Sequence, residues 1–326
     1  MAGPSVTPLV SIVVPFHNEA LTLDRCLASL TAQTEADLEI ICVDDGSVDA
    51  SPARAAGWAA RDDRITVVTQ SQSGLGAARN HGLDVATGHY LYFCDADDYV
   101  SPVTVTRCVR HLAEHDLDLV FFGGSSFLEA GCEPAPGSPL AVAFSRLETY
   151  YRRTHRYEGA FAGPRLLRLL LASGEYRVSA CMQMARRELV RANGLRFDEG
   201  VAYEDNYWTF ALTVLARRAG CLPDCLYFRS VHPDSLTARP DPALPIHGYS
   251  RSLLSIAAFA ARCAPGGEAQ AAAGQLIGQC RTNLIRAWNG LDRRAAAALL
   301  ETAPPATILV HQFIVQPLAG PGKGRP

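Results

Sequence analysis

The segment DADD at 95–98 brings three carboxylates together within four residues, directly after an apolar run. Like charges this close repel one another unless a cation joins them, and a hard divalent cation with oxygen ligands is the natural partner. An EF-hand loop does not fit, because Val100 and Thr106 occupy the positions that require glycine and glutamate. The ligands are too few for a closed calcium cage, so the segment predicts Mg²⁺ or Mn²⁺ held by Asp97 and Asp95 jointly with a ligand's phosphates. The alternative is an acidic loop that begins a helix.

A glycine-rich turn, Gly74-Leu75-Gly76, precedes Arg79. It matches a dinucleotide-binding fingerprint only weakly, because Arg79 stands where the third glycine belongs and the turn follows the third strand rather than the first. Backbone amides in such a turn can approach a phosphate or a sugar closely, with Arg79 as a fixed donor one turn inside the helix. The alternative is that Arg79 pairs with a loop carboxylate.

Polar residues also follow the first two expected strands. Phe16 can belong to the core or stack on a base, and Asn18 and Glu19 lie beside it. Asp45, after the second strand, can accept from a base N–H or a ribose hydroxyl. A phospho-receiver domain also gathers carboxylates above a parallel sheet, but the chain is far too long for one and no lysine follows the fifth strand.

The pair Glu204-Asp205 stands at an expected helix start, where acidic residues are ordinary helix punctuation. Its neighbours Tyr203, Tyr207 and Trp208 are aromatic, of the kind that sugars pack against. A metal and nucleotide site also needs a separate base for an acceptor hydroxyl. We therefore take Asp205 as the candidate general base, with helix capping as the alternative.

The elements that must position these residues form an α/β fold. Short β-rich runs alternate with helical periodicity up to residue 128, which is typical of parallel strands joined by crossover helices, with helices on both faces of a Rossmann-like, mostly parallel sheet. Ligands bind at the carboxyl ends of strands in such a sheet, so the polar clusters should converge at one edge. The expected strands are 9–16, 38–45, 65–70, 89–96 and 118–124.

The second half of the chain is less regular. The stretch 129–150 contains several glycines and prolines and predicts a long loop on the acceptor side. Helical spacing returns beyond Pro245, and the final ten residues are expected to be disordered. Further expected elements are helices at 164–172 and 205–219 and a strand at 225–231.

Composition narrows the class of protein. The 326 residues carry 30 basic and 33 acidic side chains, a formal charge of −3, which gives no electrostatic reason to expect nucleic acid as a partner. No apolar run of about 18 residues exists and the first ten residues lack the basic region of a signal peptide, so we expect a cytoplasmic protein. The ten cysteines are scattered, several within apolar runs, which favours buried free thiols over disulfides.

Five motifs in order resemble those of the family-2 inverting glycosyltransferases of the GT-A fold: VSIVVPFHNE, LEIICVDDGSVD, GLGAARNHGL, YLYFCDADD and EGVAYEDNYWTF. The resemblance covers residues 9–100 and returns at 180–237, where LYFRSVHPDSLT is similar to the family's tyrosine, arginine and serine–threonine segment. The family's processive synthases have transmembrane helices and a glutamine- and arginine-rich motif, which this sequence lacks. A single-addition enzyme of the bacterial polysaccharide or lipopolysaccharide type is the closer match.

The resemblance implies inverting transfer of a hexosyl or N-acetylhexosaminyl group from a nucleotide-diphosphate donor, in particular a UDP-sugar, with Mn²⁺ or Mg²⁺. It assigns metal and diphosphate to Asp95 and Asp97, the nucleoside to Asp45 and the acceptor base to Asp205. Phe16 stands where tyrosine is usual, which removes a hydroxyl but keeps the stacking face. The implied donor-binding residues are Pro15, Phe16, Asn18, Glu19, Asp45, Gly74, Arg79, Asp95, Ala96 and Asp97.

Three regions follow from this resemblance. Residues 1–128 are expected to bind the nucleotide sugar, and 129–239 to form the acceptor-binding, catalytic half of the same domain. Residues 240–326 match nothing in the family and should form a helical appendage. The acceptor would be a glycan or a lipid-linked saccharide in cell-surface polysaccharide synthesis. The apolar stretch 308–315 is too short to span a bilayer and is either core or a surface that contacts the inner membrane face.

Two other classes of function remain open. A sugar nucleotidyltransferase would also hold a metal and a nucleotide over a parallel sheet, but needs a basic residue aimed at a triphosphate. A catalytically inactive sugar-binding protein is disfavoured by the presence of both Asp97 and Asp205.

Overall fold

The computed structural model describes residues 8–233, 243–263 and 267–315. These residues form an eight-stranded sheet in the order β3-β2-β1-β4-β7-β6-β8-β5. The strands are β1 (Val10–Phe16), β2 (Leu38–Asp45), β3 (Ile65–Gln70), β4 (Tyr90–Phe93), β5 (Tyr99–Val100), β6 (Leu119–Leu128), β7 (Gln183–Arg186) and β8 (Ala219–Val231). The α-helices are α1 (Leu23–Thr31), α2 (Ser51–Ala59), α3 (Leu75–Val85), α4 (Thr104–Glu114), α5 (Pro139–Leu147), α6 (Gly163–Ala172), α7 (Arg187–Ala192), α8 (Asp205–Leu215), α9 (Ala243–Cys263), α10 (Gly267–Asn289), α11 (Arg293–Thr302) and α12 (Pro305–Val310).

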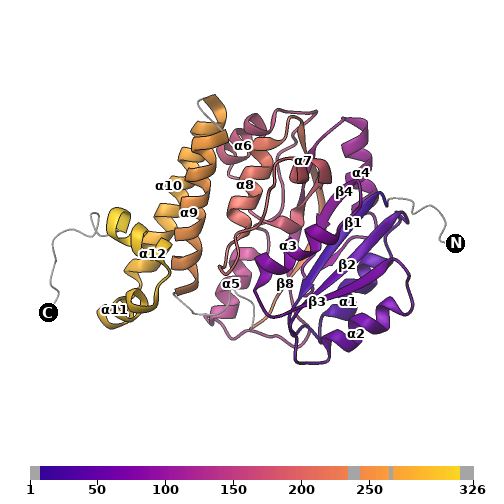
Figure 1. Cartoon of the computed structure of the whole chain (residues 1–326), viewed down its shortest axis with the longest axis horizontal. Helices are drawn as coiled ribbons and strands as arrows, with labels where there is room; N and C mark the ends of the chain where they lie inside the picture. Colours follow the sequence, from indigo (N-terminus) through magenta and orange to yellow (C-terminus); the bar gives the residue numbers. More distant parts are fainter. Residues whose placement is uncertain (1–7, 234–242, 264–266, 316–326) are drawn as a thin grey trace.

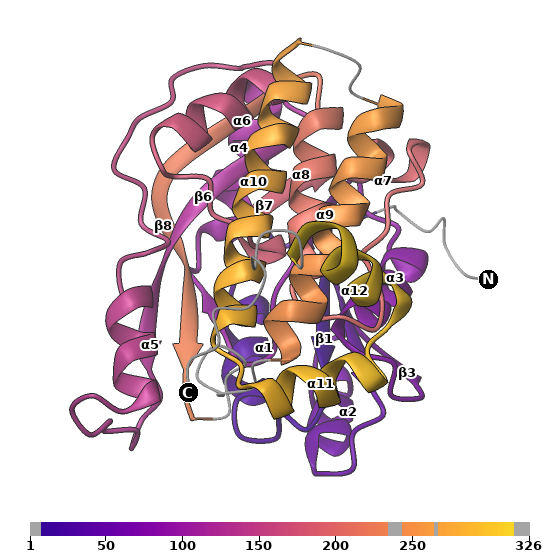
Figure 2. The same ribbon diagram turned by 90° about the vertical axis from the view of Figure 1, so that its left-hand side faces the viewer.

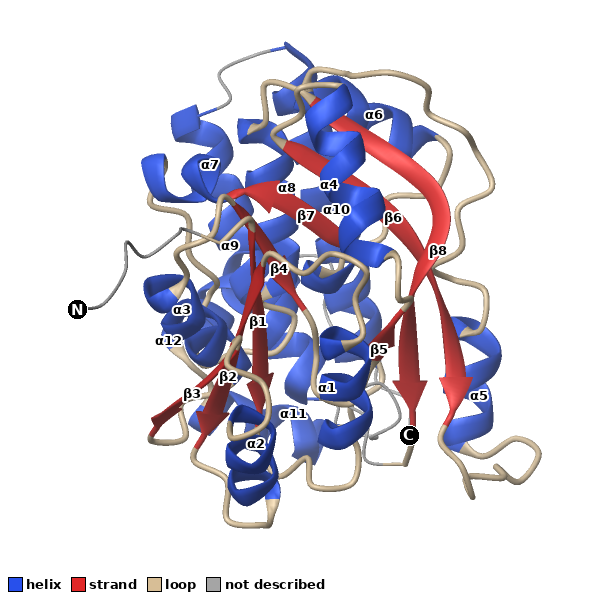
Figure 3. Cartoon of the chain, turned by 90° about the vertical axis from the view of Figure 1, so that its right-hand side faces the viewer, coloured by secondary structure: helices blue, strands red, loops and turns tan. Residues whose placement is uncertain are grey.

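The first half of the sheet is parallel, as predicted. β1 pairs with β2 and β4, and β2 pairs with β3. Every residue of β1 is buried, because helices cover the sheet on both faces. Figures 1 and 3 show α1 and α2 on one face of these strands and α3 on the other. The α/β fold class and the five expected strands are confirmed, with strand ends displaced by up to a few residues.

The second half of the sheet is mixed. β7 runs antiparallel to β4 and β6, and the long β8 runs parallel to β6 and antiparallel to β5. The expected helix at 205–219 ends earlier, at Leu215, and the strand expected at 225–231 begins at Ala219. The cause is a buried carboxylate. Asp118 Oδ2 accepts hydrogen bonds from the backbone N–H groups of Arg217 and Arg218, at 2.9 and 3.2 Å, which holds the chain in the sheet.

The stretch 129–150 is not wholly irregular, contrary to the prediction. It contains α5, whose N-cap Ser138 accepts a hydrogen bond from Ala141 N at 3.2 Å and whose first residue is Pro139. A serine followed by proline is a common helix start, so this helix had a local signal that the many neighbouring glycines and prolines obscured.

The C-terminal region is helical, as expected. Figure 2 shows α9 and α10 standing in front of α8, and both helices pack onto the α/β core, α9 against α8 and α10 against α6. The last ten residues, expected to be disordered, lie outside the described residues.

The apolar stretch 308–315 is folded into the core of the appendage. It spans the end of α12 and a π-helical turn, η2 (His311–Val315). Val310 and Val315 are buried in a small apolar cluster with Leu284 of α10, whereas Leu309 is 50% exposed. The structure therefore supports the core interpretation for the buried positions of this stretch. Within the described residues, every helix is too short or too polar to cross a membrane.

The cysteines behave as predicted. All ten are free thiols, and seven are buried. Cys225 and Cys263 are exposed, and Cys132 is half-buried.

Candidate active site

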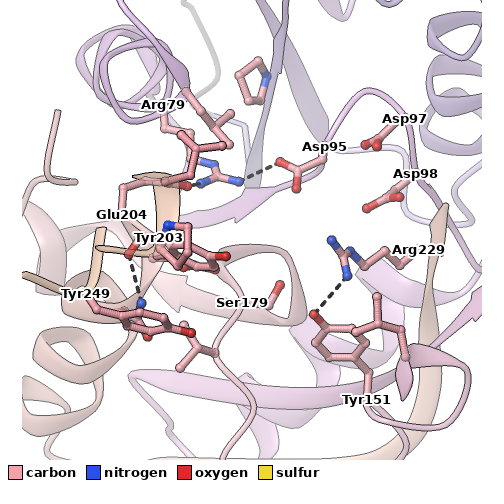
Figure 4. A pocket seen from close by; sticks show the side chains of 18 of the residues that line it. Arg79, Asp95, Asp97, Asp98, Tyr151, Ser179, Tyr203, Glu204, Arg229 and Tyr249 are labelled. Carbon is pink, nitrogen blue, oxygen red and sulfur yellow. Dashed lines mark hydrogen bonds and ion pairs between the residues drawn. The ribbon is translucent and has the colours of Figure 1, made fainter. Parts of the chain in front are cut away.

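A cavity of about 880 Å³ lies at the carboxyl ends of β1, β2 and β4 and extends to α8, α9 and α10. The convergence of polar clusters predicted for this edge of the sheet is therefore present, and Figure 4 shows part of it. The lining includes Pro15, Phe16, Glu19, Asp45, Arg79, Asp95, Ala96, Asp97 and Asp98 from the first half, and Tyr151, Tyr176, Tyr203, Glu204, Asp205, Arg229 and Tyr249 from the second.

Arg79, on α3, is the centre of a buried ion-pair network. Its Nη2 lies 2.7 Å from Asp95 Oδ1, and its Nη1 donates to Glu204 Oε1 (Figure 4). Arg79 is only 2% exposed, with its guanidinium 5.3 Å from the ring centroid of Phe197. Burial disfavours the charge, yet Asp95 and Glu204 hold the pKa of Arg79 well above its usual value. The alternative that Arg79 pairs with a loop carboxylate is confirmed, and its contact with a donor phosphate stays a prediction.

Asp98 anchors the DADD segment to β8. It accepts hydrogen bonds from the Ser230 backbone N–H at 2.6 Å and from the Tyr227 hydroxyl. Burial raises the pKa of Asp98 well above its usual value, and the charges of Asp97 and Asp95 raise it further. Asp98 therefore supports the loop rather than offering a free carboxylate to a ligand.

Asp95 and Asp97 keep carboxylate oxygens within reach of the cavity, since their side chains are 32% and 27% exposed. Asp97 Oδ2 lies 3.4 Å from His232 Nε2, while Asp95 is held by Arg79. In the described part of the chain, no three His, Cys, Asp or Glu side chains are grouped to hold a metal ion by themselves. The carboxylates fit a divalent cation whose remaining ligands come from a bound diphosphate.

Asp205 is the first residue of α8, after Glu204 at the N-cap. Its carboxylate makes no hydrogen bond or ion pair with any described residue, so the helix start does not use it as a hydrogen-bonded cap. Burial and the adjacent Glu204 raise the pKa of Asp205 to about 7, while Arg79 acts in the opposite direction. An uncommitted carboxylate that titrates near neutral pH in a cavity is suited to accept a proton.

Asp45 organises the loop after β3. Its Oδ1 accepts from Ser73 N and Gln70 Nε2, and its Oδ2 accepts from Gly74 N, all at 2.8 Å. Gly74 has a φ of +91°, which favours glycine, and a Cβ at Gly76 would lie 2.2 Å from the carbonyl oxygen of Asp198. The glycine turn thus donates backbone hydrogen bonds to Asp45 and allows close packing against the backbone at Asp198. Gly74 is not among the cavity-lining residues, and a ligand contact for Asp45 stays a prediction.

The loop after β1 has two roles. Asn18 has a φ of 57° and accepts from the backbone N–H of Val48 at 2.8 Å, so it shapes the loop and does not line the cavity. Phe16 lines the cavity but is only 3% exposed, consistent with a largely core position. Burial and the nearby Asp97 raise the pKa of Glu19 to about 7. Base stacking by Phe16 and donor contact by Asn18 or Glu19 remain predictions.

Tyrosines surround Asp205, and of these only Tyr203 was named from the sequence. Tyr203 stacks on Tyr249 with ring centroids 4.9 Å apart, as Figure 4 shows. Tyr176 is 8% exposed, and its buried hydroxyl has no partner among the described residues. Of the other aromatics proposed to contact sugar, Trp208 is 1% exposed and stacks at 4.1 Å on Phe197. Trp208 therefore belongs to the core, and Tyr207 does not line the cavity either.

Arg229 is a second arginine that lines the cavity near the DADD segment, and it was not selected from the sequence. Its Nη1 lies 3.4 Å from the Tyr151 hydroxyl, and the charges of Tyr151 and Asp98 keep its pKa above the usual value despite burial (Figure 4). The signal was present, because Arg229 lies in the LYFRSV segment that resembles the family's motif. No comparable sequence signal marked Tyr151 or Tyr176.

The chain resembles known proteins both in sequence and in structure. A sequence model described as glycosyl transferase family 2 matches residues 11–191. The chain is 34% identical over 242 residues to the uncharacterized glycosyltransferase EpsJ of Bacillus subtilis, covering 74% of this chain and 66% of EpsJ. It is 31% identical over 232 residues to the uncharacterized glycosyltransferase YibD of Escherichia coli, covering 71% and 64%. The alignments thus cover slightly less than two thirds of these relatives' length.

Solved structures share the fold. The S. aureus TarS 1–349 structure in complex with UDP-GlcNAc has a TM-score of 0.64 at 17% identity, covering 93% of this chain and 83% of that one. The mannosyltransferase PcManGT from Pyrobaculum calidifontis, in complex with GDP-Man and Mn²⁺, has a TM-score of 0.56 at 21% identity, covering 97% and 82%.

Proposed function

The chain belongs to glycosyl transferase family 2, and on that premise we propose that it transfers a sugar from a nucleotide-diphosphate donor, in particular a UDP-sugar, to an acceptor hydroxyl with inversion. The acceptor would be a glycan or lipid-linked saccharide in bacterial cell-surface polysaccharide synthesis. The observation that carries the proposal is a single cavity that joins the DADD segment to the uncommitted carboxylate of Asp205.

Asp205 acts as the general base in this reaction. As the acceptor oxygen forms its bond to the anomeric carbon, the bond from that carbon to the β-phosphate oxygen breaks. The acceptor proton passes to an Asp205 oxygen, and the bonding electron pair leaves with the nucleoside diphosphate. Attack opposite the leaving group inverts the configuration in one step. A pKa near 7 leaves a large fraction of Asp205 deprotonated at neutral pH, as this role requires.

The donor occupies the other end of the cavity. Asp97 and Asp95 would hold Mn²⁺ or Mg²⁺ together with the donor diphosphate, and that cation would neutralise charge on the leaving group. Arg79 fixes Asp95 and Glu204 at the same time, so it sets the distance between the donor end and α8. The UDP-GlcNAc and GDP-Man complexes of the structural relatives support a nucleotide sugar in this position.

A screen of UDP-, GDP- and dTDP-sugars tests the function without knowledge of the acceptor. We expect slow, metal-dependent hydrolysis of one donor, with release of the nucleoside diphosphate and the free sugar. Release of pyrophosphate from a nucleoside triphosphate and a sugar phosphate would instead identify a nucleotidyltransferase. Binding of a donor without any turnover, with acceptors added, would identify an inactive sugar-binding protein.

A further inference from the structure

The cavity wall that faces the acceptor is built partly from elements that carry none of the family motifs. α5, α9 and α10 contribute to it, together with the tyrosines near Asp205. Burial raises the pKa of Tyr176 and Tyr203, and the negative charge of Asp205 raises both further, which places these hydroxyls near that carboxylate. A ring of tyrosines beside a general base is suited to hold a polyhydroxy compound.

α10 presents three polar side chains to the cavity, beside the apolar Leu276 and Ala287. Gln279, Asn283 and Arg286 follow one another at spacings of four and three residues, so they lie on the same side of the helix, and all three line the cavity. Their side chains form no hydrogen bond with any other described residue. Amide and guanidinium groups here favour a hydroxyl-rich or charged ligand over an acyl chain.

The arginines of the cavity fall into two groups. Arg79 is paired with carboxylates, and Arg229 lies near Asp98 and Tyr151. Arg146 on α5 and Arg286 on α10 also line the cavity, but neither forms an ion pair within the described residues.

Arg146 and Arg286 are both exposed, and their guanidinium groups reach one cavity from separate helices without an ion pair among the described residues, so together they can bind an anion. The donor diphosphate is not a good candidate for this anion. It is expected at the DADD segment, where Asp97 with a divalent cation, and the nearby Arg229, would provide the contacts. Arg146 and Arg286 instead belong to α5 and α10, which line the cavity together with the tyrosines. Arg146 is close enough to Tyr203 to lower its pKa.

We propose that the acceptor is an anionic saccharide, with a phosphate or carboxylate held by Arg146 and Arg286 beside the hydroxyl that Asp205 deprotonates. The inference rests on the proposed function, and it names the substrate class for the acceptor half of that site. The α10 residues Asn283 and Gln279 bind neighbouring hydroxyls of the same saccharide.

Matched saccharides test this proposal, titrated into the full chain in the presence of UDP and Mg²⁺ and followed by saturation-transfer NMR. The pairs are trehalose with trehalose 6-phosphate, and cellobiose with cellobiouronic acid, so the two anionic groups are tested separately. We expect at least one anionic member to bind about tenfold more tightly than its neutral partner, which corresponds to about 1.4 kcal/mol. The pair that shows the preference identifies phosphate or carboxylate as the recognised group.

Three variants locate the effect. In Arg146→Gln combined with Arg286→Gln, the preference for the anion should fall to within about twofold, because both side chains lose their charge. Arg281→Gln is the matched control. Like Arg286, Arg281 is an exposed arginine of α10 that forms no ion pair among the described residues, but it does not line the cavity, so this variant should keep the full preference. Thermal unfolding checks that each variant is folded.

The proposal is wrong if the natural chain binds none of the four saccharides. It is also wrong if, in both pairs, the anionic and the neutral saccharide bind equally well. It is also wrong if the preference survives in the double variant or disappears equally in Arg281→Gln. Donor hydrolysis by the natural chain is measured in parallel. Hydrolysis without an anion preference rejects the anionic acceptor alone, whereas failure to bind or hydrolyse any nucleotide sugar rejects the proposed function.

Discussion

Asp205→Asn separates a general base from a helix-start residue, because asparagine keeps the shape but cannot accept the proton. If Asp205 is the general base, the substitution should slow the chemical step ~10²–10⁴-fold. Donor binding should change little, since the Asp205 carboxylate forms no hydrogen bond or ion pair with the DADD segment or with any other described residue. Glu204 is unsuited to replace it, because Arg79 already holds its carboxylate.

The same substitution should stabilise the protein at high pH. Burial raises the pKa of Asp205 from 3.8 to about 7 in the folded chain, so the folded state keeps its proton to higher pH than the unfolded state. The stability that this group contributes is complete below pH about 4 and is lost as the pH rises through about 7. A shift of about three units sets an upper bound of about 4 kcal/mol. Because the side chain is only half-buried, and asparagine loses about 0.5 kcal/mol of favourable interaction with the helix dipole, we expect a net gain of about 1–2 kcal/mol at pH 8.

Three measurements on natural chain and variant test this reasoning. Calorimetry with Mn²⁺ gives donor affinity, urea unfolding between pH 5.5 and pH 8 gives stability, and single-turnover hydrolysis of the donor gives the rate with water as acceptor. The rate of the natural chain should rise about tenfold per pH unit below pH 7 and level off above it, and the variant should lack this dependence. A variant that binds the donor normally, reacts within threefold of the natural rate and gains no stability at pH 8 would return Asp205 to the role of a helix-start residue.

Three further perturbations test other parts of the site. Asp97→Ala should abolish donor binding and turnover together. Asp95→Ala should cause a smaller loss, because Arg79 already holds Asp95. Equal losses at both positions, or activity of the natural chain that EDTA does not change, would contradict the metal assignment. Arg79→Lys should lower the free energy of unfolding, measured in urea, by about 1–3 kcal/mol, because lysine cannot bridge two carboxylates in a buried site. As a control, Arg196→Lys, in an exposed pair with Asp84, should lower it by less than about 0.5 kcal/mol. Similar values for the two variants would show that the network is not structurally important. In flotation with anionic liposomes, the natural chain and Leu309→Ser should both stay in the soluble fraction to the same extent, because the neighbouring Val310 and Val315 are buried. Flotation of the natural chain but not of the variant would instead establish membrane contact by this segment.

Local patterns were sufficient for the elements of the first half. Strands such as β1 and β2 are mostly apolar runs bounded by turn residues and helix starts, so their type and order follow from sequence spacing alone. The same holds for the DADD segment, since the proximity of three carboxylates is fixed by adjacency along the chain. Where local signals conflicted, as for α5 or for the end of α8 set by Asp118, the prediction failed.

Only the tertiary structure could establish the partnerships of the site. Arg79 and Glu204 are 125 residues apart, and Asp98 and Tyr227 are 129 apart. Neither pair has a periodic signal, because the contact depends on how α3, α8 and β8 pack around the sheet. The structure also decides that the Asp45 carboxylate binds backbone amides of the glycine turn and that Trp208 lies in the core. Sequence determines which residue types are available at each strand end, but packing over long sequence separations determines which of them meet, which are neutralised and which, like Asp205, remain free to react.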